Sequence, residues 1–129
     1  MTERQLLIAG ASGIIGQAVL EAFANAGWSI TTVGRSKQAP SRFPHLTADL
    51  LDSDSLAAAK ASLAGVTHLF YSALKPNTDP GVEADENAAM LENLVAAVRS
   101  AGAPLARITF VQGGKIYGAH LGVYKTPAR

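Results

Sequence analysis

Three glycines near the N-terminus have a spacing that brings a protein backbone close to an anion. They lie in Gly10-Ala11-Ser12-Gly13-Ile14-Ile15-Gly16, between a short apolar run and a stretch with helical periodicity. The first glycine permits a tight turn, the second lets a pyrophosphate approach, and the third lets the helix pack closely on the sheet. Free N–H groups at the helix start then attract phosphate. We expect these residues of the loop to contact a dinucleotide: Gly10, Ser12, Gly13, Ile14, Ile15 and Gly16.

The residues after the second predicted strand, Gly34-Arg35-Ser36-Lys37, include two cations and no acid. Enzymes specific for NAD usually have Asp or Glu at this place, where it binds the ribose 2′-hydroxyl. Arg35 can instead form paired hydrogen bonds with a 2′-phosphate, assisted by Ser12, Ser36 and Lys37. This favours NADPH over NADH as cofactor, and a solvated basic loop is the alternative.

Two further strand ends carry candidate cofactor contacts. Asp49 follows the third predicted strand and is a candidate partner for the adenine amino group, with Leu50 beside it. The alternative, which stays open, is that the acidic run from Asp49 to Asp52 caps the next helix. Ser72 and Ala73 lie at the carboxyl end of the fourth predicted strand, where we expect them to line the cofactor.

Other chemistry-bearing residues lack a productive arrangement. Tyr71 and Lys75 have a spacing that places two side chains on one face of a helix. Here the spacing falls on a strand that runs into a proline loop, so we expect no catalytic pair. His45, His68 and His120 are far apart and cysteine is absent, so we predict no metal site.

The composition is that of one globular domain. The chain has 129 residues, of which 48% are hydrophobic and 16% charged, and its net charge is +1. A balance so close to neutral does not indicate nucleic acid or a membrane surface as partner. The N-terminal apolar run is too short for a signal peptide or a membrane span, so we expect a soluble cytoplasmic protein.

The elements that position these residues alternate in type. Strands are predicted at 5–9, 29–33, 45–48, 67–73 and 107–112, and helices at 13–26, 53–63 and 82–101. Gly27 and Gly102 are placed to end two of the helices. The alternation predicts an α/β fold of the Rossmann type, a doubly wound parallel sheet with strand order 3-2-1-4-5 that is truncated before its later strands.

With these motifs in place, the glycine loop, Gly34-Arg35-Ser36 and Ala48-Asp49-Leu50 resemble the extended short-chain dehydrogenase/reductase superfamily. The progesterone 5β-reductase/iridoid synthase-like branch has a stretch similar to Val111-Gln112-Gly113-Gly114-Lys115-Ile116-Tyr117-Gly118 of this chain. Residues 120–122 and 125–128 of this chain also resemble bacterial relatives of that branch. The resemblance covers essentially the whole chain.

The resemblance implies a reductase that transfers hydride from NADPH to an α,β-unsaturated or related carbonyl compound. It makes Lys115 the catalytic cation near the developing enolate oxygen and places Gln112 along the cofactor. Many epimerases and dehydratases of the superfamily have Ser or Thr where this chain has Gln112-Gly113-Gly114. The catalytic Tyr of a later helix has no counterpart before Arg129.

We therefore expect residues 1–129 to be the N-terminal portion of an NAD(P)-binding Rossmann domain, inactive without the substrate lobe. The expected partner is a small-molecule substrate, and homo-oligomerisation stays open. Two other functions also stay open. An epimerase or dehydratase of the sugar-nucleotide type would need a downstream Tyr-x-x-x-Lys and an NAD-selecting acid. A non-catalytic NADP-binding sensor of the NmrA-like kind would keep Arg35 but would not need Lys115.

Overall fold

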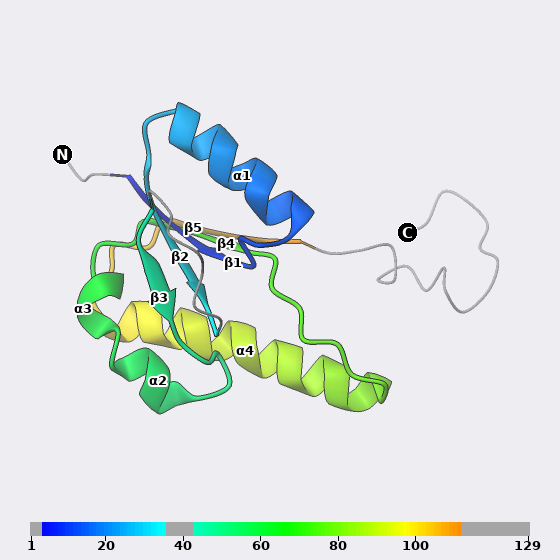
Figure 1. Ribbon diagram of the computed structural model, residues 1–129. Coiled ribbons are helices and arrows are strands. Elements are labelled where there is room, and N and C mark those ends of the chain that lie inside the picture. The colour runs from blue at the N-terminus through cyan, green and yellow to red at the C-terminus, as the bar shows by residue number, and fades with distance from the viewer. Residues whose placement is uncertain (1–3, 36–42, 112–129) are drawn as a thin grey trace.

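The computed structural model describes residues 4–35 and 43–111, which form a parallel sheet with helices on both faces (Figure 1). The strands are β1 (Gln5–Ala9), β2 (Ser29–Gly34), β3 (His45–Thr47), β4 (His68–Tyr71) and β5 (Arg107–Phe110). The helices are α1 (Ile14–Asn25), α2 (Ser53–Ala57), α3 (Lys60–Leu63) and α4 (Pro80–Ser100). The strand order is β3-β2-β1-β4-β5, so the predicted α/β fold and topology are confirmed.

The central strand β1 divides the core into two halves. Successive side chains of a strand point to opposite faces, so Leu6 and Ile8 pack with Leu20 of α1, and Leu7 packs with Leu94 of α4. Figure 1 shows α1 on one face and α2, α3 and α4 on the other. Because both faces of β1 are covered, its sequence is a continuous apolar run rather than an alternating one.

Several predicted boundaries differ from the structure, and three of the differences have a clear local cause. The helix expected over 53–63 is two short helices, because i→i+3 bonds tighten the chain around Ala59, whose N–H donates to the Leu56 carbonyl at 3.0 Å. Helix α4 begins at Pro80, earlier than predicted, because Asp79 caps it and proline is tolerated in a first helical turn. Strand β4 ends at Tyr71 because β1, its partner, ends at Ala9.

The loops at the ends of the two longest helices follow prediction. Gly27 and Gly102 have φ of +86° and +76°, the left-handed conformation that favours glycine after a helix end. The fifth strand was predicted to run to Gln112 but ends at Phe110, one residue before the described Val111, while Gln112 itself lies outside the described residues. No helix in residues 4–35 and 43–111 is long and apolar enough to cross a membrane.

Candidate functional site

The carboxyl end of β1 turns sharply at Gly10. Its φ is +90°, and a Cβ there would lie 2.6 Å from the carbonyl carbon of Ser72 at the end of β4. The Gly13 N–H closes the turn by donating to the Gly10 carbonyl oxygen at 3.3 Å. Glycine is therefore required at position 10 both by its conformation and by the close approach of a neighbouring backbone.

The other two glycines of the loop differ in what the fold requires of them. A Cβ on Gly16 would lie 2.1 Å from the Gly10 carbonyl oxygen, so the first turn of α1 packs directly on the backbone of the glycine turn. A Cβ on Gly13 would meet nothing closer than that same oxygen at 3.6 Å, and its φ of −79° suits any residue. Packing explains Gly16, whereas Gly13 borders open space.

Helix α1 begins without a side-chain cap. Gly13 occupies the N-cap position, and the first turn of α1 has no acidic residue. By contrast, Asp52 caps α2 and Asp79 caps α4 through their carboxylate oxygens. The first-turn N–H groups of α1 thus lack the side-chain acceptor that α2 and α4 have, which leaves them suited to an anion.

A cavity of about 320 Å³ opens at the carboxyl ends of the strands, beside the glycine turn. Six of the predicted cofactor contacts line it, namely Gly10, Ser12, Arg35, Asp49, Leu50 and Ala73. The lining does not include Gly13, Ile14, Ile15, Gly16 or Ser72. The predicted contacts Ser36, Gln112 and Lys115 lie outside the described residues.

The start of α1 nevertheless presents apolar side chains to solvent. Ile14 is 92% exposed and Ile15 is 50% exposed. Large apolar side chains directly after a glycine turn gain from contact with a ligand or another part of a protein. Their exposure is compatible with the predicted cofactor contact, although they lie outside the cavity.

Asp49 holds the loop before α2 and lines the cavity, and its contact with adenine stays a prediction. Its Oδ1 accepts the Leu51 N–H at 3.0 Å, and its own N–H donates to Ser55 Oγ at 3.1 Å. These bonds hold the loop after β3, while Asp52 is the residue that caps α2. Because Asp49 also lines the cavity, its loop role fixes a carboxylate at the site.

Ser72 positions the site and does not line it. Its hydroxyl donates to the carbonyl oxygens of Ala9 at 3.2 Å and Gly10 at 3.3 Å, and its N–H donates to Ala9 at 2.9 Å. The side chain thus joins the end of β4 to the glycine turn. Ala73, the next residue, lines the cavity.

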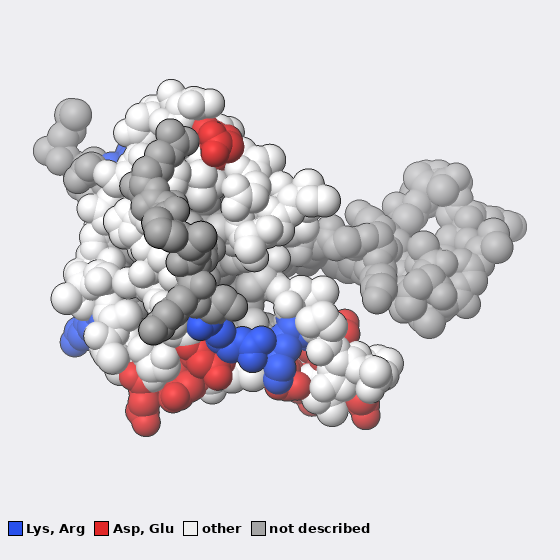
Figure 2. Space-filling view, viewed as in Figure 1, with Lys and Arg blue, Asp and Glu red and all other residues white. Residues whose placement is uncertain are grey.

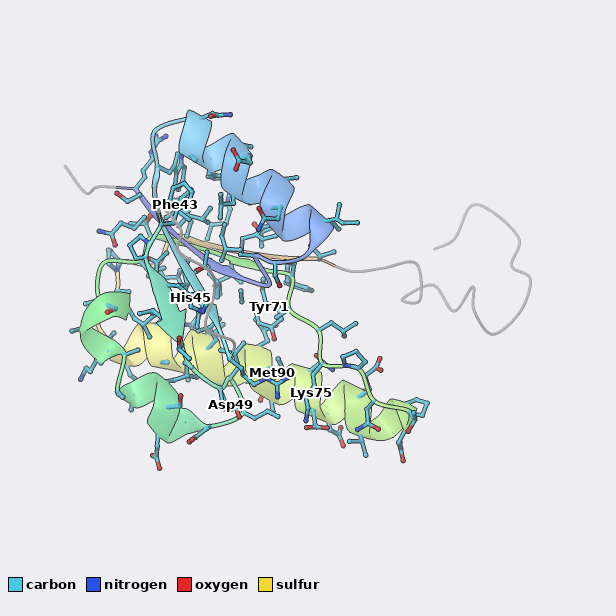
Figure 3. The ribbon with its side chains drawn as sticks, viewed as in Figure 1. Phe43, His45, Asp49, Tyr71, Lys75 and Met90 are labelled. Carbon is cyan, nitrogen blue, oxygen red and sulfur yellow. The ribbon has the colours of Figure 1, made fainter. Side chains whose placement is uncertain are left out.

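Several lining residues were not expected from the sequence. His45 accepts or donates a hydrogen bond of 2.7 Å between Nδ1 and Thr32 Oγ1, and Met90 enters the lining from α4. Lys75 lines the cavity and forms an ion pair with Glu86 of α4. Figure 3 shows His45, Asp49, Met90 and Lys75 on the α4 side of the sheet. No local motif marks these residues, since they converge from separate elements.

Tyr71, by contrast, belongs to the core. It is 7% exposed and packs between the sheet and α4, where burial raises the pKa of its phenol to about 12. Its hydroxyl has no hydrogen-bond partner within residues 4–35 and 43–111. Tyr71 is thus buried and does not line the cavity that Lys75 lines, which argues against a catalytic Tyr71–Lys75 pair. The described residues contain no group of three or more potential metal ligands.

The strand order, the glycine turn and the uncapped helix that follows it define a Rossmann-like fold. The sequence model of the NAD dependent epimerase/dehydratase family matches residues 6–128, and the chain belongs to that family.

Three known proteins illustrate the likeness. The chain is 30% identical over 133 residues to the short chain dehydrogenase gsfE of Penicillium aethiopicum, a match that covers 95% of this chain and 35% of that protein. The Bordetella bronchiseptica enzyme WbmG in complex with NAD has a similar fold, with a TM-score of 0.72, 24% identity, and coverage of 90% and 39%. A variant of Agrobacterium tumefaciens uronate dehydrogenase complexed with NAD has a TM-score of 0.67 and 23% identity, and the match covers 86% of this chain and 41% of that protein. The chain thus spans less than half the length of these proteins.

Proposed function

We propose that this chain is the N-terminal, cofactor-binding portion of an NADPH-dependent oxidoreductase that reduces an enone or a related carbonyl compound. The single observation that carries the cofactor assignment is the placement of Arg35. It lies beside the cavity into which the glycine turn opens, on the side where β2 ends.

The described residues suit a dinucleotide in three ways. The open space next to Gly13 and the uncapped first turn of α1 provide room and N–H donors for a pyrophosphate. Asp49 and Leu50 offer a polar and an apolar contact for adenine, with Ala73 across the cavity. In addition, the exposed Ile14 offers apolar surface to the part of the ligand that extends beyond the cavity.

The preference for NADPH depends on charge. An Arg side chain after β2 attracts a 2′-phosphate, whereas an acid there would repel it. Of the described residues that line the cavity, Asp49 is the one carboxylate, and it follows β3 rather than β2. WbmG and the uronate dehydrogenase variant were solved with NAD, so cofactor choice is a property on which this chain is proposed to differ from them.

The reductase assignment depends on the likeness of residues 111–118 to the progesterone 5β-reductase/iridoid synthase-like branch. Bound NADPH supplies the hydride. Adding hydride to the β-carbon of an enone leaves negative charge on the carbonyl oxygen, and the ammonium group of Lys115 is assigned to stabilise that charge. Gln112 and Ser36 are assigned to the cofactor surface.

Titration of NADPH and NADH into the protein tests the cofactor assignment. We expect NADPH to bind at least about tenfold more tightly, because a charge-assisted pair is worth about 1.5–3 kcal/mol. Arg35→Ala should remove that preference and leave NADH affinity unchanged, while the control Arg99→Ala, at the far end of α4, should change neither. Equal affinities for the two cofactors in the parent protein would refute the NADPH assignment.

A second experiment tests the reaction. The intact protein should oxidise NADPH in the presence of simple enones, and Lys115→Met should abolish turnover while NADPH still binds. Turnover by Lys115→Met at the parent rate would remove Lys115 from the reaction.

An epimerase or dehydratase is the second candidate, because the matching family model carries that description. Such an enzyme regenerates its cofactor in each cycle, so it would convert a sugar nucleotide without net oxidation of NADPH. Product analysis with and without net cofactor consumption separates the two functions. A protein that binds NADPH and turns over neither substrate class would instead fit a sensor.

A further inference from the structure

Lys75 is a cation that lines the cavity while its charge is paired with a neighbouring carboxylate. Its Nζ forms an ion pair with Glu86 Oε2, and the side chains of Lys75 and Glu86 are 32% and 24% exposed. Both groups are therefore half-buried at the edge of a cavity that, under the proposed function, holds a polyanion. An anion that binds an ammonium group more strongly than a carboxylate does could therefore take the place of Glu86 as the partner of Lys75.

The backbone of Lys75 is held in place independently of its side chain. Asn87 Oδ1 accepts the Lys75 N–H at 2.8 Å, and Asn87 Nδ2 donates to the Lys75 carbonyl oxygen at 2.8 Å. The same amide donates to the Glu83 carbonyl oxygen at 2.7 Å, so it is anchored in α4. The Cα of residue 75 is thus fixed against α4, and only the long side chain has to rotate for the ammonium group to change partners.

Lys75 and Arg35 approach the glycine turn from opposite sides. Arg35 follows β2 and Lys75 follows β4, and β1, which carries the turn, lies between those two strands. Figure 2 shows Lys and Arg side chains in a short band in front of α4, with Asp and Glu side chains beside them. A dinucleotide that lies across the turn therefore passes between Arg35 and Lys75. Lys75 is the one that the structure pairs with a carboxylate, that of Glu86.

We propose that Lys75 binds a phosphate of the dinucleotide and that Glu86 competes with this phosphate for the ammonium group. The inference rests on the proposed function, because it requires a dinucleotide in the cavity. A phosphate carries more charge than a carboxylate and offers more acceptor oxygens, so it is the stronger partner for an ammonium group. Glu86 acts through Lys75 and contacts no ligand, so it tunes affinity by holding the cation away from the phosphate.

The remaining charged groups near Lys75 do not replace Glu86 in this role. Glu83 is occupied, since its Oε2 accepts the Asn77 N–H at 3.0 Å. Asp49 lines the cavity from the loop after β3 and accepts the Leu51 N–H. Glu86 is the carboxylate that the structure pairs with Lys75, so its removal is the informative change.

Calorimetric titration of NADP⁺ and NAD⁺ tests the proposal in the parent protein, Lys75→Met, Glu86→Gln and the double variant. Lys75→Met should weaken binding about 10- to 100-fold, since a hydrogen bond to a charged group contributes about 1.5–3 kcal/mol. Glu86→Gln should tighten binding about two- to fivefold, because breaking a partly exposed ion pair costs up to about 1 kcal/mol. That gain should shrink in the Lys75→Met background, since Glu86 acts through Lys75.

Lys60→Met is the matched control, because Lys60 is an exposed lysine on α3 that does not line the cavity. It should leave both affinities unchanged. A loss shared equally by NADP⁺ and NAD⁺ would assign Lys75 to the pyrophosphate, and a loss confined to NADP⁺ would assign it to the 2′-phosphate. Either pattern supports the proposal.

The sign of the Glu86→Gln effect separates competition from a structural role. An ion pair that merely holds the loop would make both single variants bind more weakly, and that result would overturn the proposal. Unchanged dinucleotide affinity in Lys75→Met would also overturn it. In that case the proposed function would still stand, because the parent protein binds the dinucleotide. Failure of the parent protein to bind either dinucleotide would refute both.

Discussion

Gly13→Val should abolish dinucleotide binding and leave the fold nearly intact. The backbone of Gly13 is extended, with φ of −79° and ψ of 169°, a conformation that suits a β-branched residue. A Cβ at this position would lie 3.6 Å from its nearest neighbour, which is ordinary contact. The structural cost is therefore limited to replacing glycine by a poor N-cap residue, about 1 kcal/mol.

The expected loss of binding is larger than that cost. A valine side chain would occupy the open space through which a phosphate reaches the first-turn N–H groups of α1. Losing two hydrogen bonds to a charged phosphate, at about 1.5–3 kcal/mol each, corresponds to a reduction of more than about 100-fold in affinity. NADPH titration gives the affinity, and urea unfolding gives the free energy of unfolding.

Two other glycines provide matched comparisons. Gly27→Ala, far from the cavity and with φ of +86°, should lose about 1–2 kcal/mol of stability with no change in affinity. Gly16→Ala should lose both stability and binding, because its Cβ would lie 2.1 Å from the Gly10 carbonyl oxygen. Retention of parent affinity by Gly13→Val would show that the ligand does not lie on this loop. A severe loss of stability would show that the space beside Gly13 is needed by the fold.

The remaining predictions concern stability. Tyr71→Phe should leave the free energy of unfolding unchanged or raise it by up to about 1 kcal/mol, because it removes a buried hydroxyl without a described partner; a marked loss would mean that the hydroxyl is bonded. Asp79→Ala should cost about 1 kcal/mol, since the carboxylate accepts two first-turn N–H groups of α4, whereas the exposed Asp85→Ala should change stability by less than about 0.5 kcal/mol. Burial, then Arg107 and Arg4, lowers the pKa of His68 below 6.5, so the unfolded chain binds the proton more readily and stability should fall as pH drops below 6.5. Urea midpoints at about pH 7.5 and 5.5 should differ less in His68→Gln than in the parent, and an equal difference would contradict the assignment.

The parts of the fold that depend on local chemistry could be predicted from the sequence. The continuous apolar run of β1 has the predicted bounds, Gln5–Ala9, because a strand covered on both faces needs no polar residue. Gly27 and Gly102 end their helices with positive φ, as their positions predicted. The strand order followed from the alternation of elements and the handedness of crossovers. The helix ends are decided within a few residues of each glycine, whereas the strand order follows from a general rule of crossover handedness.

The parts that depend on contacts between distant segments could not be predicted. Nothing between residues 53 and 63 is a glycine or proline, yet the helix is divided, and Leu56 and Leu63 both reach the core. The hydrogen bonds from the Ser72 hydroxyl to the carbonyl oxygens of Ala9 and Gly10 are likewise not visible in the residues around Ser72. The register between β1 and β4 decides which groups Ser72 contacts, and that register cannot be predicted from the residues around Ser72 alone.

Lys75 shows the same limit at the proposed site. The one feature of Lys75 visible in the sequence is its spacing from Tyr71. That spacing would place both side chains on one face of a helix, but here it falls at the end of β4 and in the loop that follows. What matters is α4, where Glu86 pairs with the ammonium group from eleven residues away and Asn87 binds the backbone of Lys75 from twelve. Glu86 and Asn87 both lie near the start of α4, which begins at Pro80 with Asp79 as its cap. The cap at Asp79 therefore bears on the site as well as on the helix: fraying of the first turn would loosen the loop that holds Lys75, and Asp79→Ala is expected to weaken NADPH binding slightly in the parent protein but not in Lys75→Met.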